Sequence, residues 1–298
     1  MGPRPIDLHL SSLRELGYTV RDEGGRIDCA GAGSPREIHL SFPSVGATEN
    51  ILLAATGIPG VTRIINAARE PEIEDLVRFL RSAGAMITGE GSSVLHIEGG
   101  SPLSPAEYTI MPDRIAGATY ACAVASAGGE VMLRQVTPGH FSSVTALLEA
   151  AGCRVKAEVD RLFIARNGEL SPFYSVKTMP YPGFPTDAQA ILLATAIRGK
   201  GISAFTETIF ESRFRHVSEL RRMGADIRLY GKSALVFGRE TIRGARVSAH
   251  DLRCGAALVV AALGAQGETQ IDNMQYVARG YDDMPTHLNR VGAKITVL

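Results

Sequence analysis

Apolar residues with helical spacing lead into a glycine and then into an alternating strand pattern at five places along the 298-residue chain. Glycine favours the left-handed backbone just past the end of a helix, and alternation of apolar and polar residues is typical of a strand. Successive glycines lie 67, 68, 72 and 68 residues apart, which is too regular for independent helix ends. The pattern therefore predicts a repeated unit. Its helix-to-strand segments are Leu13–Val20, Phe79–Ile87, Leu147–Val155, Leu220–Ile227 and Leu288–Ile295.

Four stretches that are apolar on nearly every side alternate with these segments. A helix without a polar face belongs in the interior, so we predict that these helices are buried and surrounded by sheet. A glycine and a β-rich run follow each of them, as in Gly129–Leu133. The whole unit is therefore strand, buried helix, strand, amphipathic helix, strand, strand, and the fold class is α/β (α+β). The buried helices are predicted at Val45–Thr56, Gly117–Ala127, Pro185–Ala196 and Asp251–Ala265.

The first unit begins at its second helix, Asp7–Leu16, because five amphipathic helices accompany only four buried ones. We expect its front half to be missing, through a truncation, a late start codon or a split gene. No linker rich in proline, glycine or serine divides the chain, and the best boundary lies near Tyr108–Arg114. We predict an incomplete first domain over residues 1–111 and a second domain over residues 112–298. Open sheet edges in the first domain are expected to favour self-association.

The charge balance and the composition argue against several classes of function. Thirty-one basic residues balance 31 acidic ones, so binding to nucleic acid or to an anionic membrane through bulk charge is not expected. No apolar run is long enough to span a bilayer and no secretory leader is recognisable, which predicts a cytoplasmic protein. The four cysteines contain no CxxC pair and the seven histidines are far apart, so neither a disulfide framework nor a metal site is predicted. No nucleotide-cofactor fingerprint is recognisable.

Ionisable or hydroxyl side chains stand at the starts of three predicted buried helices. Asp187 lies at the start of Pro185–Ala196, and two interpretations are open: it caps the helix, or it orients and deprotonates a substrate hydroxyl. Asp251 and Arg253 repeat the arrangement one unit later. Ser44 offers a hydroxyl cap and free backbone N–H groups, which suit an anion. Ordinary capping explains each position alone, whereas their shared register favours a common cleft.

Three arginines lie among turn formers or aromatic residues, where a guanidinium can be fixed and aimed: Arg4, Arg213 and Arg279. Arginine outnumbers lysine 26 to 5, so many arginines are ordinary surface residues. A guanidinium fork can bind carboxylate or phosphate through two hydrogen bonds. These three residues are therefore candidates for anion binding, and an exposed surface role is the alternative for each.

Nine motifs in this order resemble the UDP-N-acetylglucosamine 1-carboxyvinyltransferase family, the enolpyruvyl transferases that begin peptidoglycan synthesis. The resemblance covers essentially the whole chain, and the number of collinear matches makes it specific. It implies two domains, each an inside-out α/β barrel of three units with helices inside and sheet outside. At about 68 residues a unit, six units need about 410 residues, so this chain would lack roughly the first 110, about a unit and a half. The motifs are GPRPIDLHLSSLRELG, FPSVGATENILLAATG, NAAREPEI, PDRI, FPTDAQA, ETIFESRF, MGAD, DLRCGAALV and RGYDD.

The resemblance implies transfer of enolpyruvyl from phosphoenolpyruvate to the 3′-hydroxyl of UDP-N-acetylglucosamine, with release of phosphate by addition and elimination and without cofactor or metal. Asp187 would bind the sugar hydroxyl and assist its deprotonation. Arg4 and Arg279, with Arg253 nearby, would hold phosphoenolpyruvate and offset charge in the tetrahedral adduct. Arg213 would also bind substrate. Residues that would contact the nucleotide sugar are Arg4, Pro5, Ile6, Asp7, Leu8, Ser44, Val45, Gly46 and Ile209.

Several positions depart from the family pattern. The cysteine of the family's mobile loop and the Lys-Asn pair near its N-terminus would lie upstream of Met1, and none of the four cysteines present matches the loop cysteine. The general acid that protonates the phosphoenolpyruvate methylene is therefore absent, and we expect no transfer by this chain alone. Ala116, Ser212 and Ala278 stand where the family usually has Glu, Asn and Asp.

Two other functions stay open. The chain is alternatively a catalytically inert nucleotide-sugar-binding paralogue, or a regulatory partner that completes its barrel with another polypeptide. The third hypothesis is the sister enzyme that acts on shikimate 3-phosphate. The stretches that match the uridine-sugar side of the cell-wall enzyme favour transfer to UDP-N-acetylglucosamine over transfer to shikimate 3-phosphate.

Overall fold

The computed structural model describes residues 6–297. The chain divides into two compact units. Unit 1 comprises Met1–Met111 with Pro180–Pro182, and unit 2 comprises Pro112–Met179 with Gly183–Leu298. Within the described range, no helix is both long enough and apolar enough to cross a membrane. The assignment of residues 1–111 and 112–298 as two enolpyruvyl-transferase domains stays a prediction.

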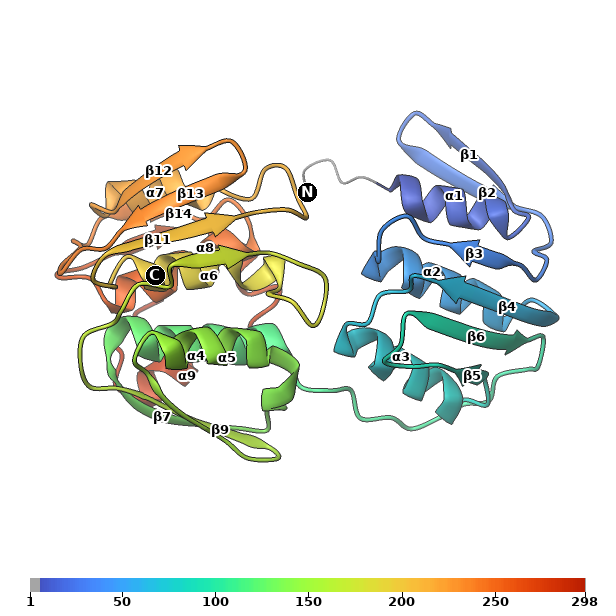
Figure 1. The fold of residues 1–298 in the computed structure, drawn as a ribbon, viewed down its shortest axis with the longest axis horizontal. Coiled ribbons are helices and arrows are strands. Elements are labelled where there is room, and N and C mark those ends of the chain that lie inside the picture. Colours follow the sequence, from blue (N-terminus) through green and yellow to red (C-terminus); the bar gives the residue numbers. More distant parts are fainter. Residues whose placement is uncertain (1–5, 298) are drawn as a thin grey trace. The chain divides into compact units, whose positions relative to one another are not determined.

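Unit 1 combines helices with a hairpin and a four-stranded sheet. Its elements are α1 (Asp7–Glu15), β1 (Thr19–Glu23), β2 (Arg26–Ala30), β3 (Glu37–His39), α2 (Val45–Thr56), β4 (Gly60–Ile65), α3 (Pro71–Ser82), β5 (Met86–Thr88) and β6 (Val94–Gly99). The sheet order is β3-β4-β6-β5, in which β3 and β4 are parallel and β6 is antiparallel to both of its neighbours. Helices α2 and α3 pack against this sheet, and α1 packs against α2 (Figure 1).

Unit 2 contains three sheets and the most deeply buried helices. Its first elements are α4 (Arg114–Ala127), β7 (Gly129–Arg134), the 3-10 helix η1 (Pro138–Phe141), α5 (Ser142–Ala150), β8 (Arg154–Ala157), β9 (Arg161–Arg166), β10 (Ser175–Lys177) and α6 (Thr186–Ala196). The others are β11 (Ile202–Thr206), α7 (His216–Arg222), β12 (Asp226–Tyr230), β13 (Ser233–Phe237), β14 (Arg246–Ser248), α8 (Leu252–Leu263), β15 (Gln270–Asp272), the 3-10 helix η2 (Met274–Tyr276) and α9 (Met284–Arg290). The sheets are β7-β9-β8, β10-β11-β13-β12 and β14-β15.

The predicted repeat is confirmed. Two complete copies are present, β3-α2-β4-α3-β5-β6 and β10-α6-β11-α7-β12-β13, and in both the sheet order is first, second, fourth, third strand. In each predicted helix-to-strand segment, the glycine that follows the helix has left-handed backbone, where other residues would be strained. These glycines are Gly17 (φ 92°), Gly84 (φ 102°), Gly152 (φ 103°), Gly224 (φ 90°) and Gly292 (φ 105°).

The four apolar helices are α2, α4, α6 and α8, and they form close to where the sequence predicts them. In unit 2, α4, α6 and α8 pack against one another. Helix α6 buries every residue from Ala188 to Ala196, and all of its apolar residues in that range belong to the core of the unit. Because these helices have no polar face, burial on all sides is the arrangement that removes most apolar surface from water.

Two details of the predicted pattern are wrong. Among the described residues, no strand follows α9, although an alternating run continues past Gly292. That segment is held instead by Asn289, whose side chain donates to the carbonyl of Ile295 and accepts from its amide, both at 2.8 Å. Helix α2 is not buried all round, since Leu53 is 52% exposed.

Candidate functional site

Side chains from the first turns of α4, α6 and α8 interact in unit 2. Asp113 caps α4 by accepting from two backbone amides of its first turn, at 2.7 and 3.1 Å. Asp251 caps α8 by accepting from the amide of Cys254 at 2.8 Å. For Asp251 the ordinary capping interpretation is therefore correct. Helix α6 differs, because its N-cap residue is Pro185 and no side chain makes a capping hydrogen bond.

Asp187 lies in the first turn of α6, and the interpretation of Asp187 as an N-cap is wrong. Its Oδ1 accepts a hydrogen bond from Nε of Arg253 at 3.1 Å and another from Nη2 of Arg213 at 3.3 Å. The Asp187 side chain is 38% exposed, and those of the two arginines are 21% and 26% exposed. Because both contacts end on Oδ1, Oδ2 can accept a hydrogen bond from a ligand hydroxyl. We call Asp187, Arg213 and Arg253 the Asp187 cluster.

The charges around the Asp187 cluster keep its carboxylate ionised. Burial raises the pKa of the Asp187 carboxyl, but the positive charges of Arg253, Arg213 and Arg114 outweigh burial, so the pKa lies below its usual value. Burial likewise lowers the pKa of Arg253, and the charge of Asp187 more than offsets it. Three guanidinium groups around Asp187 and the nearby Asp113 leave surplus positive charge, which suits an anionic ligand group.

Arg213 reaches Asp187 from the loop between β11 and α7. Its guanidinium carbon lies 4.4 Å from the centre of the Phe210 ring, a cation–π contact. The amides of Ile209 and Phe210 donate to the Glu207 carboxylate at 2.8 and 3.1 Å. These bonds fix the loop where it leaves β11. Arg213, predicted to lie among aromatic residues, contacts the Phe210 ring directly.

Tyr281 connects α4 to the segment that carries Arg279. Its buried hydroxyl lies 2.8 Å from Oγ1 of Thr119, and Thr119 donates its own proton to the carbonyl of Ile115 at 2.7 Å. Tyr281 is therefore the donor to Thr119. Burial raises the pKa of Tyr281, so the phenol keeps its proton at neutral pH.

Replacing Tyr281 with phenylalanine should lower the free energy of unfolding of unit 2 by about 1 kcal/mol, because the buried Thr119 oxygen loses its donor. Denaturation in urea measures this change. Tyr276→Phe removes a hydroxyl from a less buried site in the same segment, and we expect it to change stability by less than about 0.5 kcal/mol. Equal losses in the two variants would show that the Tyr281–Thr119 hydrogen bond contributes nothing specific.

In unit 1, the predicted nucleotide-sugar contacts gather at the first turns of α1 and α2. The Ser44 hydroxyl accepts from the amide of Ala47 at 3.4 Å, so Ser44 acts as the N-cap of α2. Helix α1 begins directly after its N-cap residue, Ile6. The predicted residues that belong to these first turns are Ile6, Asp7, Leu8, Ser44, Val45 and Gly46.

The first turns of these two helices lie close together at Gly46. A Cβ atom at Gly46 would lie 2.6 Å from the His9 ring, so a larger residue there would require the His9 side chain to move. Asn50 donates from Nδ2 to Nδ1 of His9 at 2.6 Å, which assigns the proton of a neutral His9 to Nε2. This hydrogen bond joins two residues of unit 1 that are 41 positions apart in the chain.

The remaining predicted site residues are placed as follows. Arg4 and Pro5 lie outside the described residues. Arg279 is exposed in the turn after η2 and is not among the side chains that contact Asp187 within residues 6–297. Ile209 is half-buried in the loop that carries Arg213. Over the same range, no cluster of three or more His, Cys, Asp or Glu side chains could hold a metal ion.

The thiols are poorly suited to proton transfer at the Asp187 cluster. Burial raises the pKa of Cys122 to about 12 and the pKa values of Cys153 and Cys254 to about 11. These three thiols therefore remain protonated and enclosed. Cys29 is exposed and lies on β2.

Three residues at the site were not predicted from the sequence: Arg114, Glu207 and Tyr281. Arg114 is 7% exposed and Glu207 is 1% exposed, so both are charged residues in the interior. A charged residue directly beside an apolar helix or strand is the sequence signal that marks such positions, since burial of a charge requires partners. Arg114 directly precedes the apolar part of α4, and Glu207 directly follows β11.

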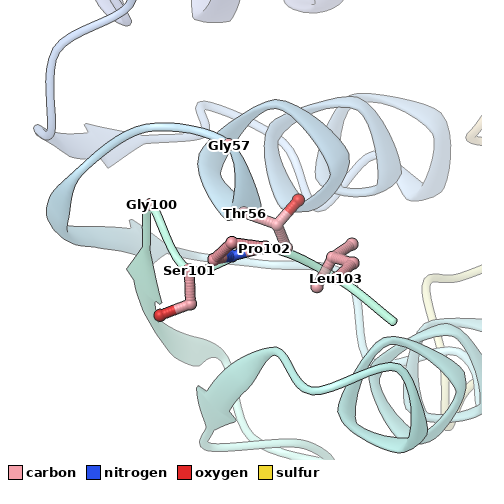
Figure 2. A pocket seen from close by; sticks show the side chains of 6 residues that line it. All are labelled: Thr56, Gly57, Gly100, Ser101, Pro102 and Leu103. Carbon is pink, nitrogen blue, oxygen red and sulfur yellow. The ribbon is translucent and has the colours of Figure 1, made fainter.

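A shallow pocket of about 340 Å³ lies in unit 1, at the C-terminal end of α2 (Figure 2). No ionisable side chain lines it, so it offers no group for catalysis or for binding an anion. Its lining residues are Thr56, Gly57, Gly100, Ser101, Pro102 and Leu103. In unit 2, by contrast, ionisable side chains converge at the Asp187 cluster.

Comparison with known proteins gives a consistent set of relatives. The sequence profile of the EPSP synthase (3-phosphoshikimate 1-carboxyvinyltransferase) family matches residues 1–288. The chain is 46% identical over 296 residues to UDP-N-acetylglucosamine 1-carboxyvinyltransferase 2 of Caldanaerobacter subterraneus subsp. tengcongensis, covering 99% of this chain and 71% of that protein. It is 45% identical to UDP-N-acetylglucosamine 1-carboxyvinyltransferase of Halothermothrix orenii, with the same two coverages, 99% and 71%.

Solved structures share the fold. The enolpyruvyl transferase NikO from Streptomyces tendae superposes with a TM-score of 0.88 at 27% identity, covering 98% of this chain and 72% of that one. EPSP synthase from Acinetobacter baumannii superposes with a TM-score of 0.75 at 19% identity, covering 99% and 72%. At this lower identity the second match supports the fold alone. The α/β fold class predicted from the repeats is confirmed.

Proposed function

Because the chain belongs to the UDP-N-acetylglucosamine 1-carboxyvinyltransferase family of enolpyruvyl transferases, we propose that it acts on the substrates of that family. The reaction moves the enolpyruvyl group of phosphoenolpyruvate to the 3′-hydroxyl of UDP-N-acetylglucosamine and releases phosphate. The observation that carries this proposal is the half-buried Asp187 carboxylate, which two arginines contact at the start of α6.

Asp187 binds the acceptor hydroxyl in this proposal. Its depressed pKa keeps the carboxylate ionised, so it accepts the hydroxyl hydrogen bond and orients the oxygen toward C2 of phosphoenolpyruvate. A carboxylate of low pKa is a weak base, so it takes the proton only as the new C–O bond forms. A proton delivered to the methylene carbon completes the tetrahedral adduct. Loss of phosphate and of one methyl proton then restores the double bond.

The surplus positive charge binds phosphoenolpyruvate. That substrate carries a phosphate and a carboxylate, and both are suited to guanidinium forks. We assign this role to Arg213 and Arg253 together with Arg4 and Arg279. Stabilising charge in the tetrahedral adduct is worth more in a site of low dielectric constant than in water. The catalytic assignment is therefore Asp187, Arg4 and Arg279, with Arg213 and Arg253 binding substrate.

The nucleotide sugar occupies the segments at the first turns of α1 and α2. Free backbone N–H groups at helix starts suit its diphosphate, which supports a binding role for this part of unit 1. Ile209 contributes an apolar contact from the loop beside Asp187. The residues assigned to this substrate are Arg4, Pro5, Ile6, Asp7, Leu8, Ser44, Val45, Gly46, Asp187 and Ile209.

The cellular role that follows is a cytoplasmic step of peptidoglycan synthesis, and through it cell-wall biogenesis, cell shape and division. A reaction on a soluble nucleotide sugar requires neither a membrane nor nucleic acid as partner. We assign residues 1–111 to the first domain of the transferase and residues 112–298 to its second domain. Self-association through the first domain belongs to the same proposal.

We expect the purified 298-residue chain to bind UDP-N-acetylglucosamine but to release phosphate far more slowly than the Caldanaerobacter relative. The enclosed, protonated thiols support this expectation, because none of them is an evident proton donor for the methylene carbon. Titration calorimetry measures binding, and a phosphate-release assay with both substrates measures turnover. The Caldanaerobacter relative is the positive control.

The outcomes separate the candidate functions. Turnover near the rate of the positive control would contradict the expected lack of activity. Binding of the nucleotide sugar without turnover, even when the part of the relative that this chain does not match is supplied, favours the inert paralogue or regulatory partner. Binding of shikimate 3-phosphate in preference to the nucleotide sugar would overturn the proposed substrate.

A further inference from the structure

Glu207, the first residue after β11, is a buried carboxylate with four hydrogen-bond donors around it. It is 1% exposed. Its Oε1 accepts from the hydroxyl of Thr178 at 2.9 Å and from the amides of Ile209 and Phe210 at 2.8 and 3.1 Å. Its Oε2 accepts from the hydroxyl of Thr186 at 2.8 Å. A carboxylate can accept all four of these bonds, so its burial is compensated.

Three of these four partners lie on the two segments that meet in the Asp187 cluster. Thr186 directly precedes Asp187 at the start of α6. Phe210 is in the loop that carries Arg213, and its ring contacts the Arg213 guanidinium. The buried Glu207 side chain thus holds both the backbone next to Asp187 and the loop that carries Arg213.

The same position in two other repeats carries a different residue type. Asn66 after β4 and Asn273 after β15 both have left-handed backbone, with φ of 60° and 64°. The Asn66 amide donates to the carbonyl of Leu40 at 2.8 Å, and the Asn273 amide donates to the hydroxyl of Ser248 at 2.8 Å. Each asparagine therefore ties the end of its strand to the end of the parallel neighbour.

Glu207 makes the equivalent contact, since Thr178 directly follows β10, the parallel neighbour of β11. Its backbone is not left-handed, and it adds the bonds to Thr186 and to the loop amides. A neutral amide is enough to join the strand ends in two repeats. The need to join strands therefore does not explain a buried carboxylate in the repeat that contains Asp187.

We propose that Glu207 is a positioning residue that fixes the loop of Arg213 against the start of α6, so that Arg213 and Asp187 face the same ligand. The identity of that ligand as the acceptor sugar rests on the proposed function. The positioning itself does not, because it concerns the pairing of two protein side chains. Glu207 acts through Arg213 and Asp187 and does not touch the ligand.

The test is a titration of the Asp187 carboxyl by NMR in the full chain labelled with ¹³C-aspartate, without ligand. In Glu207→Ala the loop amides lose their acceptor and Arg213 moves away, so the pKa of Asp187 should rise toward its usual value. Glu207→Gln keeps the shape but replaces one acceptor oxygen with an NH2 group, so only part of the hydrogen bonding to the loop and to Thr186 is lost and a smaller rise is expected. In an Arg213→Gln background, neither substitution should raise the pKa further, because the effect acts through Arg213.

Glu219→Gln is the matched control. Glu219 is another buried carboxylate of unit 2, 7% exposed, and it accepts from the amide of Ser248 at 2.9 Å without contacting the Asp187 cluster. It should leave the pKa of Asp187 unchanged. An unchanged Asp187 pKa in Glu207→Gln, or equal rises with and without Arg213, would overturn the proposal. So would an equal rise in Glu219→Gln.

A second readout separates this inference from the proposed function. Affinity for UDP-N-acetylglucosamine should fall about tenfold in Glu207→Gln and stay unchanged in Glu219→Gln. If the wild-type chain does not bind the nucleotide sugar, the proposed function fails, while the ligand-free titration still decides the role of Glu207. If the sugar binds equally well to wild type and Glu207→Gln, the positioning role fails alone.

Discussion

Replacing Asp187 with asparagine should weaken binding of UDP-N-acetylglucosamine by about ten- to a hundredfold, because a hydrogen bond to a charged group is worth about 1.5–3 kcal/mol. Asparagine has nearly the same shape but no negative charge. Arg213 and Arg253 then lose their counter-ion, and the acceptor hydroxyl loses a strong acceptor. Titration calorimetry at neutral pH, with stability checked by thermal melting, measures the effect.

Asp226→Asn is a matched control for this prediction. Asp226 is a carboxylate of unit 2 that also pairs with two arginines, Arg239 at 3.2 Å and Arg228 at 3.7 Å. It lies on β12, away from the first turn of α6. We expect its removal to leave affinity unchanged. Equal losses for the two variants would mean that a general loss of charge, and not contact with the ligand, weakens binding.

Lowering the pH from 7 to 4 should cost unit 2 about 3 kcal/mol of stability through His216 alone. Burial lowers the pKa of His216 from 6.5 to about 4, and the nearby Asp251 offsets only part of this. The ring contacts the backbone of Arg213, and within the described residues its Nε2 has no hydrogen-bond partner. Protonation would therefore place an unpaired charge in the interior.

The sign of the effect follows from the lowered pKa. The folded state binds fewer protons than the unfolded state, so the stabilisation is complete above pH 6.5 and is lost as the pH falls toward 4. Ionised Asp187 also stabilises the folded state. Its contribution is lost at lower pH than that of His216, because its pKa in the folded state lies below 3.8. Urea denaturation at a series of pH values separates the two windows.

His216→Asn tests the assignment of the upper window. Asparagine retains a side-chain N–H near the position of Nδ1 and does not titrate. The variant should lose most of the slope of stability between pH 6.5 and 4, whatever its stability at neutral pH. A slope equal to that of the wild-type protein would assign the acid sensitivity to other groups.

The fold was predictable where one pattern repeats. The glycine spacing and the alternation of apolar helices located α2 at its observed bounds, and α6 and α8 nearly so. The strand expected after Gly292 does not form among the described residues, and the repeat pattern alone could not show this. An alternating run specifies a strand only when a neighbouring strand is available to pair with it, and here Asn289 holds the backbone of Ile295 instead.

The Asp187 cluster was predictable in part for the same reason. Asp187 and Arg253 are 66 residues apart, close to one repeat, so equivalent helix starts bring them together. Whether Asp187 caps its helix or binds arginines depends on a rotamer that residue type does not decide. Glu207 was missed because a glutamate after a strand is usually solvated, and only the tertiary structure shows that four donors surround it.

The most direct test compares UDP-N-acetylglucosamine with its 3′-deoxy analogue on wild type and on Asp187→Asn by calorimetry. If Asp187 binds the acceptor hydroxyl, removing that hydroxyl weakens binding to the wild-type chain by about tenfold or more and has little further effect on the variant. If both proteins lose the same affinity when the 3′-hydroxyl is absent, Asp187 does not contact it, and the account of this site is wrong.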